Sequence, residues 1–333
     1  MKEIAFVDNI HEFLSTLQYP QMLLLVDENV HKNYSQLLDE FDTIVVPPGE
    51  YSKSFTLVEE LIGMMLESGY QRDSLLVGVG GGVVTDITGF VASVYMRGMP
   101  FGLIPTTLLA MTDAAIGGKN GVNVGKIKNC AGTIRQPEFV TVWPDFLNTL
   151  AQKEFRNGMA EVIKHAILEG DDFMKFLFEN IEKIKQKDDQ ILKEMIQRSA
   201  DFKLSIVKQD EFDNDVRHLL NLGHTIAHAL EAETRLSHGE CVAAGIILDA
   251  KIAQRKELCD DNFTGMISQL MKSYELPETI PYNTEALMSK IAADKKRREN
   301  HIRYVLPVAP GDYRIVNMDE SELRNHLKNF END

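Results

Sequence analysis

Three of the nine histidines lie within twenty residues, in the segment NLGHTIAHALEAETRLSHGE (221–240). His224 and His228 are four residues apart, so they share one face of a helix. His238 follows ten residues after His228. Zinc takes imidazole and carboxylate ligands, and a catalytic zinc site uses three protein ligands and keeps one position open. The segment therefore predicts a catalytic metal site built on histidines.

Two further polar residues precede these histidines at helical spacing. Arg217 and Asn221 lie seven and three residues before His224, so a helix over 215–234 would place both on the face of the histidines. A single histidine on a helix is more often a residue with a satisfied hydrogen bond than a ligand. A stripe that combines a cation, an amide and two imidazoles favours a functional face.

Two glutamates are candidates for the acidic ligand. Glu161 lies in the helical segment GMAEVIKHAI (158–167), on one face with Lys164 and His165 and among apolar residues. A solvated helix face is the alternative, since charge pairs at this spacing are common. Glu240 follows His238 by two residues. Spacing alone favours His224 and His228 as ligands, because they share a helix face, and makes His238 a third candidate, with Glu161 or Glu240 as the carboxylate. It does not decide among these sets.

A glycine turn in GVGGGVVTD (78–86) follows an apolar strand and begins a helix. Glycines let a backbone approach a phosphate closely, and a helix N-terminus favours negative charge. A tight strand–helix turn is the alternative, because the spacing is not that of the common dinucleotide or P-loop motifs. Asp86, one turn into the helix, and Asp27 and Asn29 at the end of an earlier strand favour a dinucleotide site.

Cations gather around glycine-rich segments of an acidic chain whose net charge is −15. The segment 112–132 carries Lys119, Lys126, Lys128 and Asn129, and other candidates are Arg97, Lys164, Lys203, Arg217 and the run DKKRR (294–298). Most lysines and arginines in any protein lie on the surface. Concentrated near glycine turns, however, they indicate an anionic substrate. The net charge argues against a general nucleic-acid binder.

The remaining composition favours a cytoplasmic protein that binds no membrane. No stretch approaches the ~20 apolar residues of a membrane span, and the first residues do not resemble a signal peptide. Three cysteines without metal-ligand spacing indicate reduced thiols that pack in the interior.

The pattern of elements predicts two domains, an α/β domain over 1–147 and an all-α domain over 148–333. Apolar strands at 22–27, 43–50, 74–82, 101–107 and 138–144, with a helix at about 55–68, indicate a parallel sheet covered on both faces. Helical periodicity then dominates, at 151–168, 171–185, 188–208, 215–234, 239–255, 262–273 and 284–293. A short hairpin is expected at 301–316.

These motifs together resemble the 3-dehydroquinate synthase family of sugar-phosphate cyclases. The resemblance extends from PPGEYSKS (47–54) to the DKK run and the VLP strand at 305–307. In the family's order, the chain carries GGGVVTDITGF, YMRGMPF, PTTLLA, GGKNGVN, KNCAG, AEVIKHAI, LLNLGHTIAHALE and HGE. Eight ordered motifs are far more specific than any one of them.

The resemblance implies a dehydroquinate synthase-like fold with an NAD-binding α/β domain and a helical metal domain, in a homodimer. It implies conversion of 3-deoxy-D-arabino-heptulosonate 7-phosphate to 3-dehydroquinate and phosphate, the second step of the shikimate pathway. NAD would be used and regenerated within one turnover, and zinc would be the metal, with cobalt able to occupy the same ligands. A related sugar-phosphate cyclase and a metal-dependent polyol dehydrogenase are the alternatives.

Matched motif by motif, the resemblance also implies roles for individual residues. The metal ligands would be Glu161, His224 and His238, and His228 would assist proton transfer beside Asn221. The other catalytic residues would be Lys119, Lys164 and Asp113. Phosphate contacts would be Lys119, Asn129 and Lys296 (or Lys295), with Arg97 from a partner subunit, and Lys203 and Arg217 would bind a carboxylate. The NAD positions would be Asp27, Asn29, Glu50, Lys53, Gly81, Gly82, Asp86, Thr106, Thr107 and Lys128.

Two residues depart from the pattern of the family. Thr85 stands where many members have glycine before the aspartate, and Asn120 replaces a frequent threonine after Lys119. Neither departure affects a proposed metal ligand.

Overall fold

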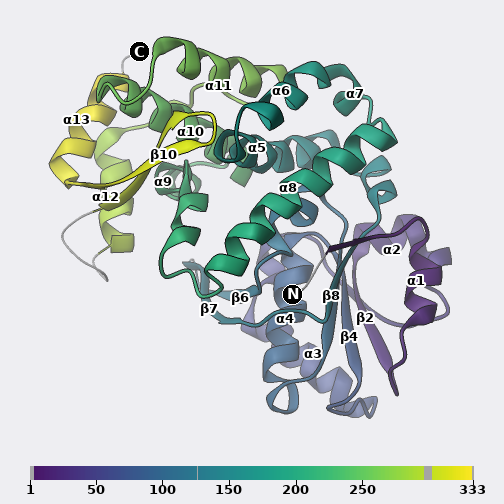
Figure 1. Ribbon diagram of the computed structural model, residues 1–333. Coiled ribbons are helices and arrows are strands. Elements are labelled where there is room, and N and C mark those ends of the chain that lie inside the picture. Colours follow the sequence, from purple (N-terminus) through teal and green to yellow (C-terminus); the bar gives the residue numbers. More distant parts are fainter. Residues whose placement is uncertain (1–3, 126, 296–301, 332–333) are drawn as a thin grey trace. The chain divides into compact units, whose positions relative to one another are not determined.

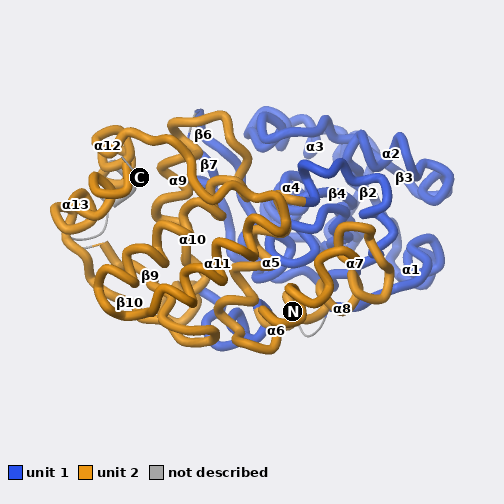
Figure 2. Tube along the Cα trace, turned by 90° about the horizontal axis from the view of Figure 1, so that it is seen from above, with its two compact units in different colours: residues 1–155, 203–212 blue, residues 156–202, 213–333 orange. Residues whose placement is uncertain are grey.

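The computed structural model describes residues 4–125, 127–295 and 302–331, which form two compact units (Figure 2). Unit 1 contains residues 1–155 and 203–212, and unit 2 contains residues 156–202 and 213–333. Both units are therefore discontinuous in sequence, because the last turns of one long helix cluster with unit 1. Within the described residues, no helix combines the length and the apolar character that crossing a bilayer requires.

A six-stranded parallel sheet forms the centre of unit 1 (Figure 1). In spatial order its strands are β1 (Ile4–Phe6), β8 (Phe139–Val142), β5 (Phe101–Pro105), β4 (Leu75–Gly80), β2 (Met22–Asp27) and β3 (Asp42–Val46). Every residue of β4 and β5 is buried, as expected for central strands covered on both faces. The predicted parallel α/β fold is confirmed, although β1, of three residues, was too short to give a sequence signal.

The helices of unit 1 differ in length and in how clearly the sequence marks them. They are α1 (Ile10–Thr16), α2 (Glu28–Tyr34), α3 (Phe55–Glu67) and α4 (Gly82–Val94). The predicted helix α3 begins where the Ser54 side chain accepts a hydrogen bond from the backbone N–H of Leu57, and it buries Val58, Leu61 and Met65. The helices α1 and α2, of seven residues each, offer too few turns for a clear 3.6-residue period.

The strand order reverses between β2 and β4. From β2 the chain continues to β3 on one side, then returns to β4 on the other side and continues to β5. Ligands of open α/β sheets bind outside the carboxyl ends of the strands at such a switch point. The fold thus marks the ends of β2 and β4 as a position for a ligand.

An antiparallel hairpin, β6 (Lys119–Val124) and β7 (Ile127–Ile134), also belongs to unit 1. The sequence predicted only an irregular, glycine-rich segment here. Gly121 and Gly132 pair across the two strands, and a Cβ on Gly132 would lie 2.3 Å from the carbonyl oxygen of Asn120. The glycines that hide the strand pattern therefore permit the close pairing of this hairpin.

The described part of unit 2 is mostly helical, as predicted, and contains one hairpin. Its helices are α5 (Gln152–Glu169, beginning in unit 1), α6 (Asp171–Glu179), α7 (Ile181–Lys185), α8 (Asp189–Gln209, ending in unit 1), α9 (His224–Glu233), α10 (His238–Arg255), α11 (Asp261–Ser273), α12 (Thr284–Lys295) and α13 (Glu320–Phe330). The strands β9 (Ile302–Ala309) and β10 (Asp312–Met318) form the predicted hairpin. The helix α10 is almost wholly buried and packs against α9, α11 and β9, so it forms the core of this unit.

The predicted helix over 215–234 is wrong, because the chain breaks at Gly223. A 3-10 helix covers Val216–Asn221, and α9 starts only at His224. Gly223 has a φ of 80°, its N–H donates to Asp249 Oδ2 at 2.7 Å, and a Cβ there would lie 2.6 Å from Ile246 Cγ1. Close packing on α10 thus requires the turn, and Arg217 and Asn221 do not continue the helical face of His224.

Three smaller expectations also differ from the structure. The predicted helix 171–185 is two helices, α6 and α7, separated at Asn180, and α13 was not predicted. Cys130 is exposed and Cys259 is partly exposed, so the prediction of interior packing holds only for Cys241.

Candidate metal centre and cofactor edge

Three predicted site residues from separate helices of unit 2 converge on one point. Glu161 comes from α5, and His224 and His238 are the first residues of α9 and α10. The Glu161 Oε1 atom lies 3.4 Å from His224 Nε2 and 3.2 Å from His238 Nε2. One possible ligand atom from each residue lies within 4.8 Å of the others. The three side chains thus present a compact N, N, O donor set.

Both histidines are held by their Nδ1 atoms, so that their Nε2 atoms face the same carboxylate. His224 Nδ1 lies 3.1 Å from the carbonyl oxygen of Leu222, and His238 Nδ1 lies 2.7 Å from Glu231 Oε1. In metal sites the second ring nitrogen of a ligating histidine is usually bonded in this way. The residues present therefore fit a divalent metal with three protein ligands.

The start of α10 fixes the backbone of His238. Ser237 and Glu240 form a capping box, in which Glu240 Oε2 accepts hydrogen bonds from the Ser237 N–H and hydroxyl, both at 2.7 Å. A Cβ on Gly239 would lie 2.3 Å from the carbonyl oxygen of Asn157, so α5 and α10 can approach closely only with glycine there. The Glu240 carboxylate serves this cap, and Glu161 is the acid in the cluster.

Burial and neighbouring charges set the protonation of the cluster. Burial raises the pKa of Glu161, but the charge of Lys164 and the interactions with the imidazoles of His224 and His238 outweigh it and hold that pKa well below its usual value. Lys164 forms an ion pair with Glu161 Oε2. Burial, joined by Lys164, lowers the pKa of His224 to about 3. His224 is therefore a neutral imidazole at neutral pH, able to act as a ligand.

His238 has the opposite electrostatic balance. Burial lowers its pKa, but the hydrogen bonds to Glu161 and Glu231 outweigh burial and raise the pKa to about 10. At neutral pH the imidazole is thus protonated and bridges the carboxylates of Glu161 and Glu231. A metal ion that takes the Nε2 position must displace that proton.

Two other histidines lie close to the cluster but do not join its donor set. The His228 ring packs edge-on against His224, with 5.5 Å between ring centroids. His165 is fully buried, and its Nδ1 lies 2.7 Å from the Ser199 hydroxyl. The structure brings together Glu161, His224 and His238 rather than the i, i+4 pair of histidines with a third group.

In unit 1, several predicted NAD residues share the carboxyl edge of the sheet. Asp27 ends β2, and its side chain accepts a hydrogen bond from the backbone N–H of Asn29 at 2.8 Å. Gly81 and Gly82 begin α4, directly after β4. Thr106 and Thr107 follow β5, and Glu50 follows β3. These residues flank the switch point between β2 and β4.

The glycines of the turn have two different roles. A Cβ on Gly78 would lie 2.3 Å from the Thr88 hydroxyl, and one on Gly80 would lie 2.6 Å from Val84 Cβ. These two glycines let α4 pack on β4, which is the structural explanation of the motif. A Cβ on Gly82 meets only Ala114, at 3.3 Å, so Gly82 at the helix N-terminus is the more open position for a phosphate.

A buried lysine joins the sheet edge to the β6–β7 hairpin. Lys53 Nζ lies 2.6 Å from Asp86 Oδ2, is bonded to Asn129 Oδ1, and is 3.9 Å from Glu50 Oε1. Asn123 extends the network, because its Nδ2 donates to Glu50 Oε1 at 2.8 Å and its Oδ1 accepts from the Asn129 N–H at 2.8 Å. Three predicted NAD positions and one predicted phosphate contact thus form one network.

Burial raises the pKa of Asp86 to about 6, although Lys53 acts in the opposite direction. The carboxyl group therefore titrates near neutral pH. This shift follows from the position of Asp86 at the start of α4, under the hairpin, where solvent reaches it poorly.

The remaining predicted cations occupy varied environments. Lys203 Nζ donates to Asp113 Oδ1 at 2.6 Å and to its backbone carbonyl at 2.7 Å, and Asp113 lies in a π-helical turn over Ala110–Ala114. Lys119 and Lys128 are exposed on the hairpin, and Arg217 is buried. Arg97 is exposed, with a φ of 65°. Lys296 lies outside the described residues.

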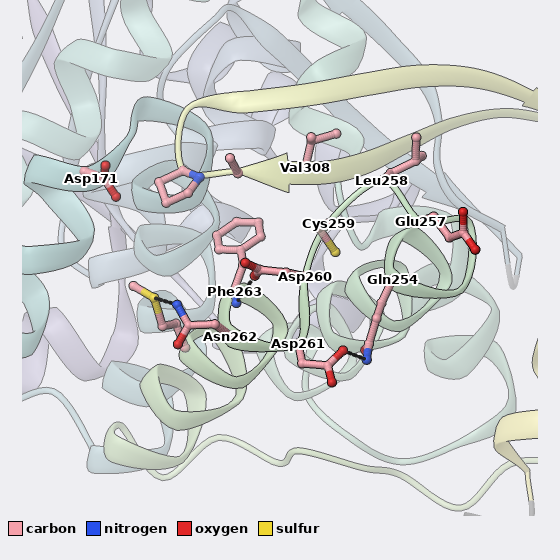
Figure 3. A pocket seen from close by; sticks show the side chains of 13 residues that line it. Asp171, Gln254, Glu257, Leu258, Cys259, Asp260, Asp261, Asn262, Phe263 and Val308 are labelled. Carbon is pink, nitrogen blue, oxygen red and sulfur yellow. Dashed lines mark hydrogen bonds between the residues drawn. The ribbon is translucent and has the colours of Figure 1, made fainter.

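The pocket in Figure 3 is not this centre. It has a volume of about 630 Å³ and is formed by the end of α10, the start of α11 and the end of β9. Its lining includes Phe263 and the acidic side chains of Asp171, Asp260 and Asp261 (Figure 3). Among the residues that the structure describes, no predicted site residue lines this pocket.

Two residues, one beside the metal centre and one in the Lys53 network of unit 1, were not found from the sequence. Glu231 lies seven residues after His224 on α9, two helical turns along the same face, so its spacing could have nominated it. Asn123 had no such signal, because its position depends on the hairpin register between β6 and β7.

Known proteins resemble this chain over most of its length. The family pattern described as 3-dehydroquinate synthase N-terminal matches residues 43–157, and the pattern described as 3-dehydroquinate synthase C-terminal matches residues 158–297. The 3-dehydroquinate synthase of Pseudoalteromonas translucida is 39% identical over 88% of this chain and 86% of its own length. That of Shewanella sp. (strain MR-4) is 40% identical over 87% and 84%.

A solved structure has the same fold. The 2-epi-5-epi-valiolone synthase of Streptomyces hygroscopicus, with NAD+ and Zn2+ bound, has a TM-score of 0.90 and 25% identity, covering 100% of this chain and 98% of its own. The two curated relatives are more similar to this chain in sequence than the valiolone synthase is. The chain belongs to the 3-dehydroquinate synthase family of enzymes.

Proposed function

We propose that the chain converts 3-deoxy-D-arabino-heptulosonate 7-phosphate to 3-dehydroquinate and phosphate, with NAD and a divalent metal, zinc or cobalt. The observation that carries this proposal is the convergence of Glu161, His224 and His238, in a chain 39% identical to a curated 3-dehydroquinate synthase. Zinc and NAD are supported by the bound groups of the valiolone synthase.

The metal would be held by the two Nε2 atoms and the Glu161 carboxylate. Three protein ligands leave a coordination position for oxygen atoms of the substrate. Lys164, paired with Glu161, would contact the ring hydroxyls of the substrate, and its charge would keep the carboxylate ionised. These assignments rest on the fit of the donor set and on the family's motifs.

NAD would bind at the carboxyl edge of the sheet in unit 1. The switch point between β2 and β4 supports this assignment, together with the open glycine at the start of α4. The proposed contacts are Asp27, Asn29, Glu50, Lys53, Gly81, Gly82, Asp86, Thr106, Thr107 and Lys128. The NAD-binding domain would cover residues 1–147, and the metal- and substrate-binding domain would cover residues 148–333.

The substrate carries a phosphate and a carboxylate, which explains two groups of cations. Phosphate contacts would be Lys119, Asn129 and Lys296, with Arg97 from a partner subunit of a cytoplasmic homodimer. The exposed position of Arg97 supports this role. Lys203 and Arg217 would bind the carboxylate. A substrate without a carboxylate would not need this pair, which favours dehydroquinate synthase over related cyclases.

The chemistry divides between the bound groups and the side chains. When bound, NAD would accept and return a hydride, and the metal would lower the pKa of substrate hydroxyls. His228, beside His224, would move a proton at the substrate with Asn221 as its neighbour, and Asp113 would lie near the reacting carbon. Oxidation of the substrate alcohol acidifies the adjacent C–H, so that phosphate leaves by elimination before re-reduction, ring opening and aldol closure.

A single assay separates this function from its main alternative. The purified protein would be mixed with NAD, zinc and the heptulosonate phosphate, while free phosphate and NADH absorbance are followed together. Phosphate release without net NADH is expected. NADH accumulation without phosphate would indicate a polyol dehydrogenase instead, and the proposal would be wrong.

A further inference from the structure

We propose that Glu231 is a positioning residue that orients His238 as a metal ligand, an inference that rests on the proposed metal site. Neither the family's motifs nor the helical stripe assigned a role to Glu231. The structure places its Oε1 atom 2.7 Å from His238 Nδ1, and its side chain is 10% exposed. The contact joins α9, which carries His224, to the first residue of α10.

The hydrogen bond selects one tautomer of the imidazole. When Nδ1–H donates to the Glu231 carboxylate, the neutral ring keeps its lone pair on Nε2. That Nε2 atom lies 3.2 Å from Glu161 Oε1, on the side where the donor atoms converge. Glu231 thus directs the lone pair of His238 toward the metal position.

The two histidines of the cluster differ in what holds them. The acceptor for His224 is a neutral backbone carbonyl, that of Leu222 at 3.1 Å, whereas the acceptor for His238 is a carboxylate. A carboxylate makes the shorter and stronger bond and raises the basicity of the ligand. Glu231 also adds a second negative charge to that of Glu161. This charge offsets the positive charge of Lys164, which lies next to the proposed metal position.

The matched control lies close by on the same helix. Glu233 also belongs to α9, but its Oε1 pairs with Lys290 at 3.0 Å and its side chain is 35% exposed. Replacing Glu233 by glutamine therefore makes the same chemical change on the same helix without affecting His238.

The experiment measures metal binding directly. Chelator-treated wild-type protein and the variants E231Q, E231L and E233Q would be titrated with Zn2+ against a chromophoric chelator, and Co2+ would be added separately to record its visible spectrum. Glutamine keeps an acceptor for Nδ1–H but loses the charge, whereas leucine loses both. We expect the Zn2+ Kd to rise about 10-fold in E231Q and up to about 100-fold in E231L, with a changed Co2+ spectrum. E233Q should match the wild-type protein.

Each outcome decides a separate question. If the wild-type protein binds Zn2+ and releases phosphate but E231Q and E231L bind Zn2+ equally well, the role of Glu231 is refuted while the proposed function stands. If the wild-type protein binds neither Zn2+ nor Co2+, both are refuted. Circular dichroism of the variants checks that they fold. E231Q is nearly isosteric, so a well-folded variant with weakened Zn2+ binding and an altered Co2+ spectrum supports positioning rather than a general structural role.

Discussion

Lys53 and Asp86 form a buried ion pair at 2.6 Å in which the carboxylate is still hard to ionise. The Lys53 side chain is 4% exposed and that of Asp86 is 19% exposed. Burial raises the pKa of Asp86 to about 6, from an ordinary value of 3.8. The cost of burying the carboxylate therefore exceeds what the lysine returns, as is common for buried ion pairs.

The stability of unit 1 should fall as pH rises through this window. Because the folded state binds the Asp86 proton more tightly than the unfolded chain, the stabilising contribution is complete below about pH 4 and is lost by about pH 6 to 7. A rise of the pKa from 3.8 to about 6 corresponds to about 3 kcal/mol. Denaturant unfolding between about pH 4.5 and about pH 7.5 would be followed by fluorescence of Trp143, the single tryptophan, which lies in unit 1.

The variant D86N should lose most of this pH dependence. D73N, which changes an exposed aspartate of the same unit, should keep the wild-type dependence. An identical pH slope in D86N and the wild-type protein would show that Asp86 does not titrate in this range.

Lys203 should contribute to substrate binding rather than to NAD binding. Its Nζ is bonded to Asp113 at two atoms and is buried, so it presents a fixed charge to a carboxylate. Removing a charged hydrogen bond costs about 1.5–3 kcal/mol, so kcat/KM of K203M should fall about 10- to 100-fold. Steady-state kinetics and NADH titration measure the two effects. K208M, which changes an exposed lysine on the same helix, is the control, and equal kinetics in both variants would exclude this role.

The zinc content of single variants should distinguish the metal ligands from the other histidine among His224, His228 and His238. H224A and H238A should lose zinc, because each removes one of the converging Nε2 donors. H228A should retain about one zinc per chain but lose about 10²- to 10⁴-fold in kcat, as expected for a proton-transfer residue. Mass spectrometry of protein-bound metal provides the readout. Loss of zinc from H228A, with retention in H238A, would restore the i, i+4 pair as the ligands.

The sequence pattern was sufficient for the longer helices and for the strands that are continuous apolar runs. The helices α3, α5, α10 and α11 were predicted close to their observed bounds, and so were the buried strands β2, β4 and β5. The seven-residue helices α1 and α2 and the three-residue strand β1 contain too little of a helical or strand pattern to be recognised. The hairpin of β6 and β7 was missed because glycines replace the alternating apolar residues of ordinary strands.

The spacing of residues in the sequence predicted only part of the candidate metal site. The relevant histidines were found at once, but spacing favoured His224 with His228. The structure instead gathers His224, His238 and Glu161 because Gly223 ends the preceding turn and α10 starts directly at His238. Such a choice depends on tertiary packing between α5, α9 and α10, which no local pattern encodes. Their role as metal ligands remains a prediction.

Gly223 should tolerate no side chain, in contrast to another glycine of unit 2. Alanine at a φ of 80°, with Cβ 2.6 Å from Ile246 Cγ1, combines left-handed strain with overpacking and should cost about 3 kcal/mol. Gly265 lies exposed within α11, and a Cβ added there would meet no neighbouring atom within 4 Å. The variant G265A should therefore be more stable by about 1 kcal/mol. Unfolding followed by far-ultraviolet circular dichroism measures both.

The turn at Gly223 also sets the position of His224, so the same variant should affect metal binding. Asp249 holds the Gly223 N–H through Oδ2 and accepts a hydrogen bond from the Tyr304 hydroxyl at 2.5 Å through Oδ1. Because G223A displaces this turn, its Zn2+ affinity should fall while that of G265A stays at the wild-type value. If G223A were as stable as the wild-type protein and bound Zn2+ equally well, the turn would not be what aligns His224 with His238 and Glu161.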